Sequence, residues 1–273
     1  MFPPLLPVLH PPTEDAGTFH GSMLLHKELE SIKSSADVVL VANVKSPGLL
    51  KTDTVHAAIE IQEKLHRPTA AAVVVRDQNR AQFDTAVFTA ASAGLDSLFL
   101  AWGDDYPPSS GITNVRDFSS LADAIRRASV IRSKARAKTR IFAPVDVGSL
   151  AKPKGVALAK GRLRAGADLL LAQPPTTDPA ETFDAHASLV GKAGLKDKVL
   201  LSVFPFRDLN DIKRYEELFG WKLPNRIHQE ASKGETRLDQ LARGVVQRLG
   251  TEAFPGVYLV ARGNPGIASH LLA

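Results

Sequence analysis

The chain has 273 residues and a formal net charge of +5, with 44% hydrophobic and 23% charged residues and no cysteine. This composition excludes a disordered or fibrous chain, and the lack of cysteine excludes disulfides and thiolate metal sites. No apolar run approaches the roughly 18 residues that span a bilayer, and the proline-broken N-terminus has the pattern of neither a signal peptide nor an anchor. We expect one domain over residues 1–273, cytoplasmic by default, with the mitochondrial matrix left open.

Short apolar runs recur along the chain, and most of them lack the alternation of a half-exposed strand. Parallel strands that helices cover on the outside have this continuous apolar pattern. The expected strands are residues 5–10, 38–42, 70–75, 97–102, 140–145, 168–172, 199–203 and 257–261.

Segments with helical spacing separate these strands, and several begin at Asp or Asn and end before Gly. Eight βα units in this length predict a (β/α)8 TIM barrel. The alternative is a doubly wound open sheet, but no glycine-rich phosphate loop follows any expected strand. The expected helices are residues 53–66, 79–93, 117–138, 152–165, 178–191, 208–219 and 236–249.

Much of the excess positive charge lies in residues 126–140. A basic cluster can meet nucleic acid, a membrane or an acidic protein, but no aromatic residue interleaves with this one to stack on bases. We therefore favour a solvated helix face over a docking surface. The basic residues are Arg126, Arg127, Arg132, Lys134, Arg136, Lys138 and Arg140.

The ends of the expected strands carry polar and aromatic residues. In a TIM barrel the chemistry occurs at the carboxyl ends of the strands. The most informative segment is residues 99–111, where an apolar run ends at Gly103-Asp104, although an Asp at such a place can also simply cap a turn. The set predicts a mouth for an aromatic, partly anionic molecule and has no metal-site spacing. Its members are His10, Asp77, Trp102, Asp104, Asp146, Gln173, Phe204, Phe206, Arg207 and Arg262.

Several of these segments, in this order, resemble the methylenetetrahydrofolate reductases. Residues 8–13 (Val-Leu-His-Pro-Pro-Thr) are similar to the family's Glu-Phe-Phe-Pro-Pro-Arg, and residues 100–108 to its Leu-Arg-Gly-Asp-x-Pro-Pro. Residues 160–168 with Ala172-Gln173 resemble its Lys-x-Lys-x-x-Ala-Gly-Ala and Thr-Gln segments, and Phe204-Pro205 and residues 257–259 resemble its last two strands.

The resemblance implies a TIM barrel that reduces 5,10-methylene-tetrahydrofolate to the 5-methyl form with hydride from a reduced FAD. It places Asp104 near flavin and folate and Gln173 against the folate. The family's first-strand glutamate, its general acid, falls at Val8, and Trp102 replaces the arginine of the Arg-Gly-Asp segment. Further departures are Ala42, Ala72 and the run 143–147, at positions that mostly hold the flavin.

These departures indicate a divergent member whose flavin contacts are partly lost. Some relatives take hydride directly from a reduced nicotinamide, so NADH or NADPH is the candidate hydride source. We assign catalysis to His10, which shares a strand face with Val8, and to Asp104 and Asp146. Two alternatives stay open: a non-catalytic barrel that serves as a binding or assembly subunit, and a folate-dependent methyl transferase. A homo-oligomer or a protein partner also stays open, and we expect the chain to bind neither a membrane nor nucleic acid. Substrate binding is assigned to Gln173, Phe204 and Arg207, cofactor binding to Trp102, Asp104 and Asp77, and metal binding to no residue.

Overall fold

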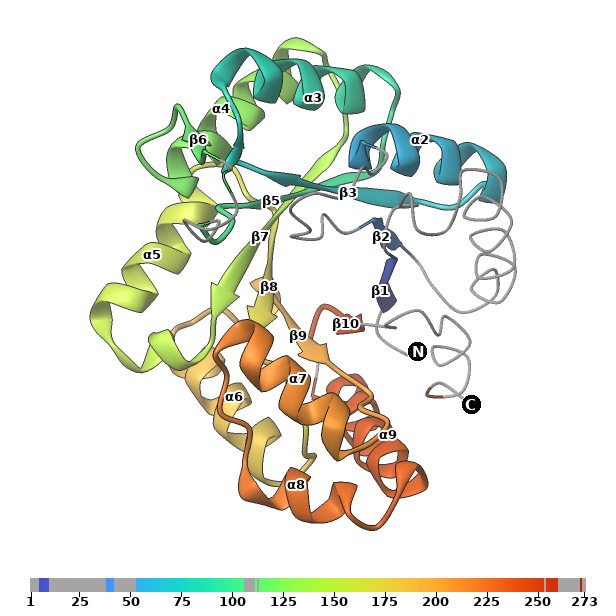
Figure 1. Ribbon diagram of the computed structural model, residues 1–273. Helices are drawn as coiled ribbons and strands as arrows, with labels where there is room; N and C mark the ends of the chain where they lie inside the picture. The colour runs from blue at the N-terminus through green and yellow to red at the C-terminus, as the bar shows by residue number, and fades with distance from the viewer. Residues whose placement is uncertain are drawn as a thin grey trace.

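Eight parallel strands close into a barrel in the computed structural model, which describes residues 5–9, 38–41, 53–105, 111, 113–252, 254–259 and 271 (Figure 1). This confirms the expected TIM barrel. Around the barrel the order is β1-β10-β9-β8-β7-β5-β3-β2. The strands are β1 Leu5–Leu9, β2 Val39–Val41, β3 Thr69–Val74, β5 Ser97–Ala101, β7 Arg140–Asp146, β8 Leu169–Gln173, β9 Val199–Val203 and β10 Val257–Leu259.

Helices surround the barrel, and all seven expected helices are present. The two-residue strands β4 (Asp77–Gln78) and β6 (Val115–Arg116) pair outside the barrel and were not expected. The helices are α2 Thr54–Leu65, α3 Arg80–Ser92, α4 Leu121–Lys134, α5 Pro153–Arg164, α6 Glu181–Lys192, α7 Leu209–Phe219, α8 Asn225–Ala231 and α9 Glu235–Thr251, with the 3-10 turns η3 Gly148–Ala151 and η4 Lys196–Lys198. Of these, α8, η3 and η4 were also not expected.

Capping side chains mark the starts of α2, α3, α4 and α7. Asn79 accepts the N–H of Gln82 at 2.9 Å in a capping box, as the expected start of α3 requires. The expected start of α4 at Asp117 was wrong, because the Asp117 carboxylate accepts the N–H of Arg80 at 3.0 Å instead. Ser120 is the cap, and it accepts the N–H of Asp123 at 3.2 Å.

In the barrel strands whose side chains the structure describes, alternate residues enter two different apolar clusters. The interior cluster, inside the barrel, includes Leu40, Phe142, Leu171, Leu200 and Tyr258 and continues into α7, α8 and α9. The outer core lies between the strands and the helices and takes the intervening strand residues. Whether the side chain at the end of a strand points into the barrel or toward the helices therefore follows from its distance, in residues, from a strand residue of known cluster.

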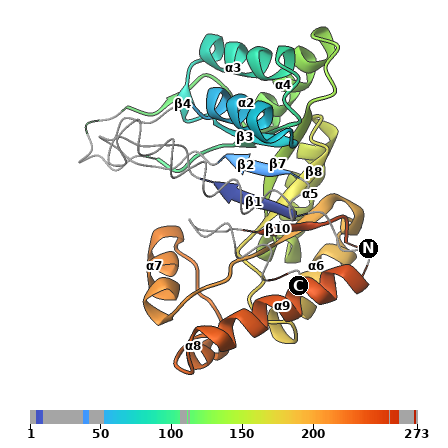
Figure 2. The same cartoon turned by 90° about the vertical axis from the view of Figure 1, so that its right-hand side faces the viewer.

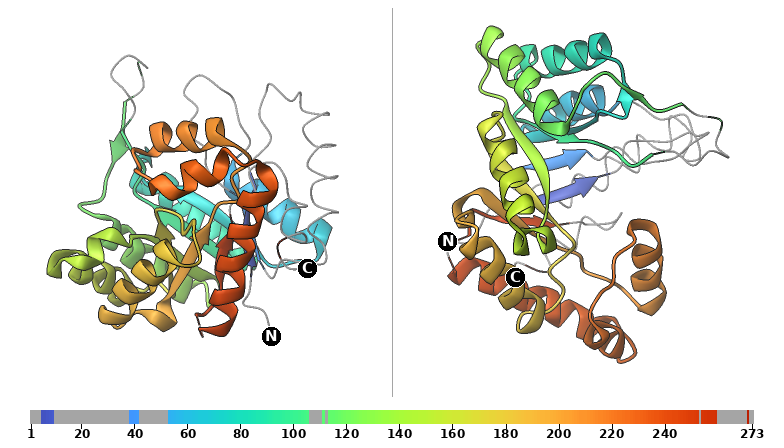
Figure 3. Two further views of the ribbon diagram at one scale, coloured as in Figure 1. Left: turned by 90° about the horizontal axis from the view of Figure 1, so that it is seen from below. Right: turned by 90° about the vertical axis from the view of Figure 1, so that its left-hand side faces the viewer.

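All eight strands run the same way, so their carboxyl ends gather on one side of the barrel. In Figure 2 the arrowheads of β1 and β2 point toward the side where α7 and β4 lie. The view from the opposite side shows the same relation between the strands and α7 (Figure 3, right). This end is the one at which a TIM barrel carries its site.

Candidate functional site

Asp146 and Gln173 are brought together at the carboxyl ends of β7 and β8. The two residues are paired in the strand register, as Pro144 is with Leu171. Phe142 and Leu171 belong to the interior cluster, so the two-residue period puts Asp146 and Gln173 on that same face. Gln173 is half-buried and Asp146 is exposed. The pair therefore presents a carboxylate and an amide side by side at the mouth of the barrel.

Two further charged or titratable groups interact with Asp146. Burial lowers the pKa of the Arg162 guanidinium on α5, and the nearby Asp146 carboxylate opposes that shift. Burial lowers the pKa of His186 on α6 to about 4, although the negative charge of Asp146 acts to raise it. His186 is thus neutral at pH 7, and its Nδ1 lies 2.9 Å from the Thr176 hydroxyl oxygen.

Backbone hydrogen bonds hold the loops around this pair. The N–H of Val147 donates to the Gln173 carbonyl at 2.8 Å, which ties the end of β7 to the end of β8. The N–H of Thr176 donates to the Ser202 carbonyl at 2.7 Å, which ties the loop after β8 to β9. The Arg162 guanidinium also donates to the Pro144 carbonyl. The mouth between β7 and β9 is therefore preorganised.

Aromatic rings cover the interior beyond β9. Phe204 is 5% exposed and belongs to the interior cluster. Its ring centroid lies 6.1 Å from that of Phe206, 5.7 Å from Tyr215 and 5.5 Å from Trp221, the last two edge-on. Burial raises the pKa of the Tyr215 hydroxyl. The cluster forms an apolar wall at the end of the barrel that also carries Asp146 and Gln173.

Arg207 lies at the rim beside this wall. Its side chain is 62% exposed, and Nε is 3.7 Å from Oδ2 of the buried Asp211. The same carboxylate accepts the backbone N–H of Arg207 at 3.1 Å. Asp211 therefore fixes the backbone at the start of α7, while the guanidinium stays open to solvent.

The structure separates Trp102 from the interior. Trp102 packs against the outer core, as Leu100 and Leu98 do two and four residues earlier. Gly103 follows with φ +80°, and the buried Arg76 guanidinium donates to the Asp104 carbonyl at 2.6 Å. The Asp104 side chain is exposed. This turn, which the sequence marked as most informative, is held by Arg76, a residue that sequence reasoning missed.

Several assigned residues lie outside what the structure describes. His10 and Arg262 are outside the described residues, and of Asp77 only the backbone, in β4, is described. The backbone of Val8 pairs with Leu40. Arg162, Thr176 and His186 were missed as site residues, because long-range packing brings them to Asp146. Arg162 alone had a signal, since it lies in the segment that resembles the family's Lys-x-Lys run.

The described residues contain neither a candidate metal site nor a candidate membrane span. No group of three or more His, Asp or Glu side chains among them could hold a metal ion. None of the described helices is both long and apolar enough to cross a membrane.

The sequence profile of the methylenetetrahydrofolate reductases matches residues 18–252. The chain belongs to the methylenetetrahydrofolate reductase family. No curated protein matches this family member.

Solved structures share the barrel at low sequence identity. A protein from Clostridium thermocellum that binds two copies of 5-methyl-5,6,7,8-tetrahydrofolic acid aligns with a TM-score of 0.71 and 10% identity, over 99% of this chain and 95% of that one. A 2,3-dimethylmalate lyase aligns with a TM-score of 0.56 and 11% identity, over 98% of this chain and 79% of that one. An oxaloacetate acetylhydrolase aligns with a TM-score of 0.55 and 11% identity, over 97% of this chain and 78% of that one. At these low identities the three comparisons show that this family member shares its fold with them, and no more than the fold.

Proposed function

We propose that the chain binds a reduced folate at the carboxyl end of the barrel and reduces its 5,10-methylene bridge to a 5-methyl group. The observation that carries the proposal is the register pairing of Asp146 with Gln173 on the interior face, at the mouth of the barrel. Family membership and the fold neighbour that binds 5-methyl-tetrahydrofolate support the folate as ligand.

Gln173 suits the polar edge of a pterin. A pterin presents N–H donors next to a carbonyl acceptor, and a side-chain amide has both a donor and an acceptor to match them. Gln173 is half-buried, and the exposed Asp146 beside it is left for the proton transfer. Phe204, with its neighbours Phe206 and Tyr215, gives the apolar surface that a flat ring needs.

The reaction needs one hydride and one proton. A proton on N10 opens the methylene bridge, and the resulting N5 iminium carbon accepts the hydride to become the methyl group. In the family the acid is a first-strand glutamate, and this chain has Val8 there. We assign the proton transfer to Asp146, with His10 and Asp104 as the other candidates.

We infer that the hydride comes directly from NADH or NADPH, which becomes NAD⁺ or NADP⁺. Trp102, in place of the family arginine, packs in the outer core and offers no charge to a flavin phosphate. Ala143, Val145 and Val147, in the run that replaces Tyr-Pro-Glu-x-His, are buried in the same core. These residues do not fit FAD, so the proposed hydride transfer does not use it.

Two measurements on the purified full chain test the proposal. Titration calorimetry with 5-methyl-tetrahydrofolate measures binding, and loss of absorbance at 340 nm with 5,10-methylene-tetrahydrofolate and NADH or NADPH, without added flavin, measures turnover. We expect saturable binding, and a loss of affinity of about tenfold in Gln173→Ala, the cost of one hydrogen bond to a polar ligand. The matched control is Gln240→Ala, an exposed amide on α9.

Asp146→Asn tests the proton transfer. Because the amide keeps the shape but cannot donate an acid proton, we expect kcat to fall about 100-fold while folate affinity changes much less. Unchanged kcat would move the acid role to His10 or Asp104, whose His10→Ala and Asp104→Asn variants are then decisive.

A non-catalytic folate-binding barrel is the second candidate, and the replacement of the family acid by Val8 favours it. It predicts folate binding that needs Gln173, with no oxidation of NADH or NADPH and no effect of Asp146→Asn beyond binding. Turnover in the absence of flavin would exclude it. Absence of folate binding would overturn both candidates.

A further inference from the structure

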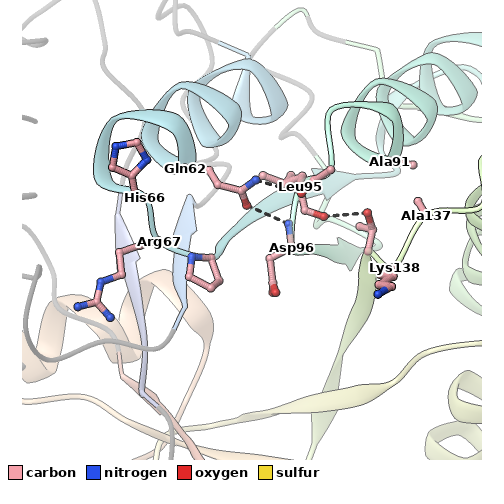
Figure 4. A pocket seen from close by; sticks show the side chains of 11 residues that line it. Gln62, His66, Arg67, Ala91, Leu95, Asp96, Ala137 and Lys138 are labelled. Carbon is pink, nitrogen blue, oxygen red and sulfur yellow. Dashed lines mark hydrogen bonds between the residues drawn. The ribbon is translucent and has the colours of Figure 1, made fainter.

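A surface pocket lies at the amino-terminal end of the barrel, opposite the candidate site. It has a volume of about 410 Å³ and is lined by residues just before β3, β5 and β7 (Figure 4). Small-molecule sites in proteins commonly have volumes of about 300–1,000 Å³. We propose that this pocket binds a small anion that carries a carboxylate or phosphate group.

Side-chain hydrogen bonds hold the walls of this pocket in place. Gln62 accepts the N–H groups of Thr69 at 3.3 Å and Asp96 at 3.0 Å and donates to the Gly94 carbonyl at 3.0 Å. The Thr139 hydroxyl donates to the Leu95 carbonyl at 2.7 Å. A ligand therefore meets loops that are already fixed, which lowers the entropy cost of binding.

The charge of the lining is positive. Asp96 is its one carboxylate, and Arg140, outside the pocket, pairs with it at 2.6 Å. Arg67 and Lys138 are also in the lining, and Figure 4 shows them on opposite sides of Asp96. His66 ends α2 beside Arg67, in the left-handed conformation with φ 51°. Because the single negative charge is compensated, the pocket attracts anions.

The basic segment 126–140 explains why positive charge remains here. Four of its cations pair with carboxylates: Arg126 with Asp123, Arg127 with Asp84, Arg132 with Asp168 and Arg140 with Asp96. Lys134, Arg136 and Lys138 make no ion pair with any residue that the structure describes, and Lys138 is the one of the three that lines the pocket.

Apolar residues also line the pocket, namely Pro68, Ala91, Leu95 and Ala137. An anion with a short carbon body fits this combination better than a bare ion does, because the body covers apolar surface while the charge faces Lys138. A short dicarboxylate and inorganic phosphate are the matching probes. Comparing them shows whether the pocket prefers a carboxylate or a phosphate group.

Titration calorimetry of the full chain with glutarate, and separately with inorganic phosphate, tests the proposal at low salt. We expect saturable binding of at least one probe, weakened about tenfold or more by Lys138→Glu. Lys134→Glu is the matched control, since Lys134 is an exposed cation of the same segment that does not line the pocket, and we expect less than about a twofold change.

The proposal is overturned if neither probe binds saturably, or if both variants weaken binding equally, which would indicate only the general charge of the chain. Binding of 5-methyl-tetrahydrofolate should be the same in Lys138→Glu as in the unmodified chain, because the two sites lie at opposite ends of the barrel. This keeps the anion site distinguishable from the proposed folate site.

Discussion

The two ends of the barrel use their polar residues differently. At the amino end, Gln62, Thr139 and Asp96 bond to backbone groups or to Arg140 and hold the loops together. At the carboxyl end, the side chains of Asp146 and Gln173 lie in register on the interior face, and no hydrogen bond to another described residue engages the Gln173 amide. The difference separates residues that hold the fold from residues left to face a ligand.

A matched pair of glycine substitutions should give the largest contrast in stability between the ends. In Gly103→Ala, with φ +80°, the new Cβ would lie 2.4 Å from Val74 Cγ1 and 2.9 Å from Arg76 Cβ. We expect a loss of about 3 kcal/mol or more in the free energy of unfolding. Gly94→Ala has φ +68° with nothing within 4 Å, and should cost about 1 kcal/mol. Urea denaturation measures both, and equal losses would contradict the crowding at Gly103.

His186 should make the carboxyl end sensitive to acid. Its pKa is about 4 in the folded chain, against 6.5 ordinarily, so the unfolded chain binds the proton first as pH falls. The contribution of His186 to the free energy of unfolding is therefore at its full value above pH 6.5, and it falls by roughly 3 kcal/mol as the pH is lowered to 4. Urea denaturation at pH 7.5 and 4.5 should show a smaller pH difference in His186→Gln. An equal difference in both proteins would exclude this role.

Gln62→Ala, at the amino end, should give a smaller loss of stability than Gly103→Ala or the protonation of His186. It removes the partners of two backbone N–H groups, those of Thr69 and Asp96, and we expect a loss of about 2 kcal/mol. Folate affinity should not change, because Gln62 acts only on the loops. Gln240→Ala, exposed on α9, is the control and should stay within about 0.5 kcal/mol. A loss of folate affinity in Gln62→Ala would contradict the separation of the two ends.

The barrel strands could be predicted from the sequence because each is a short apolar run between helical segments. Local patterns were less informative where a side chain has two uses: Asp117 has the chemistry of a helix cap but accepts the N–H of Arg80. The pair β4–β6 is too short to leave a pattern, and its strands lie far apart along the chain.

The candidate site was predictable only where a residue ends a strand. Asp146, Gln173 and Phe204 were found in this way, and the structure places them on or beside the interior face. Trp102 was assigned to the same mouth, but its face depends on whether Leu100 points inward or outward, which an all-apolar strand does not reveal. Arg162 and His186 lie on helices, and only the packing of α5 and α6 brings them to Asp146.

The pairing of β7 with β8 also determines which changes of length this protein can accept. A residue inserted in the crossover between the two strands leaves Asp146 opposite Gln173, because the ladder of hydrogen bonds is untouched. A single residue inserted within either strand inverts every side chain beyond it and turns the carboxylate or the amide toward the helices. Natural variation in length should therefore accumulate around η3 and α5, while the spacing from Phe142 to Asp146 and from Leu171 to Gln173 stays constant.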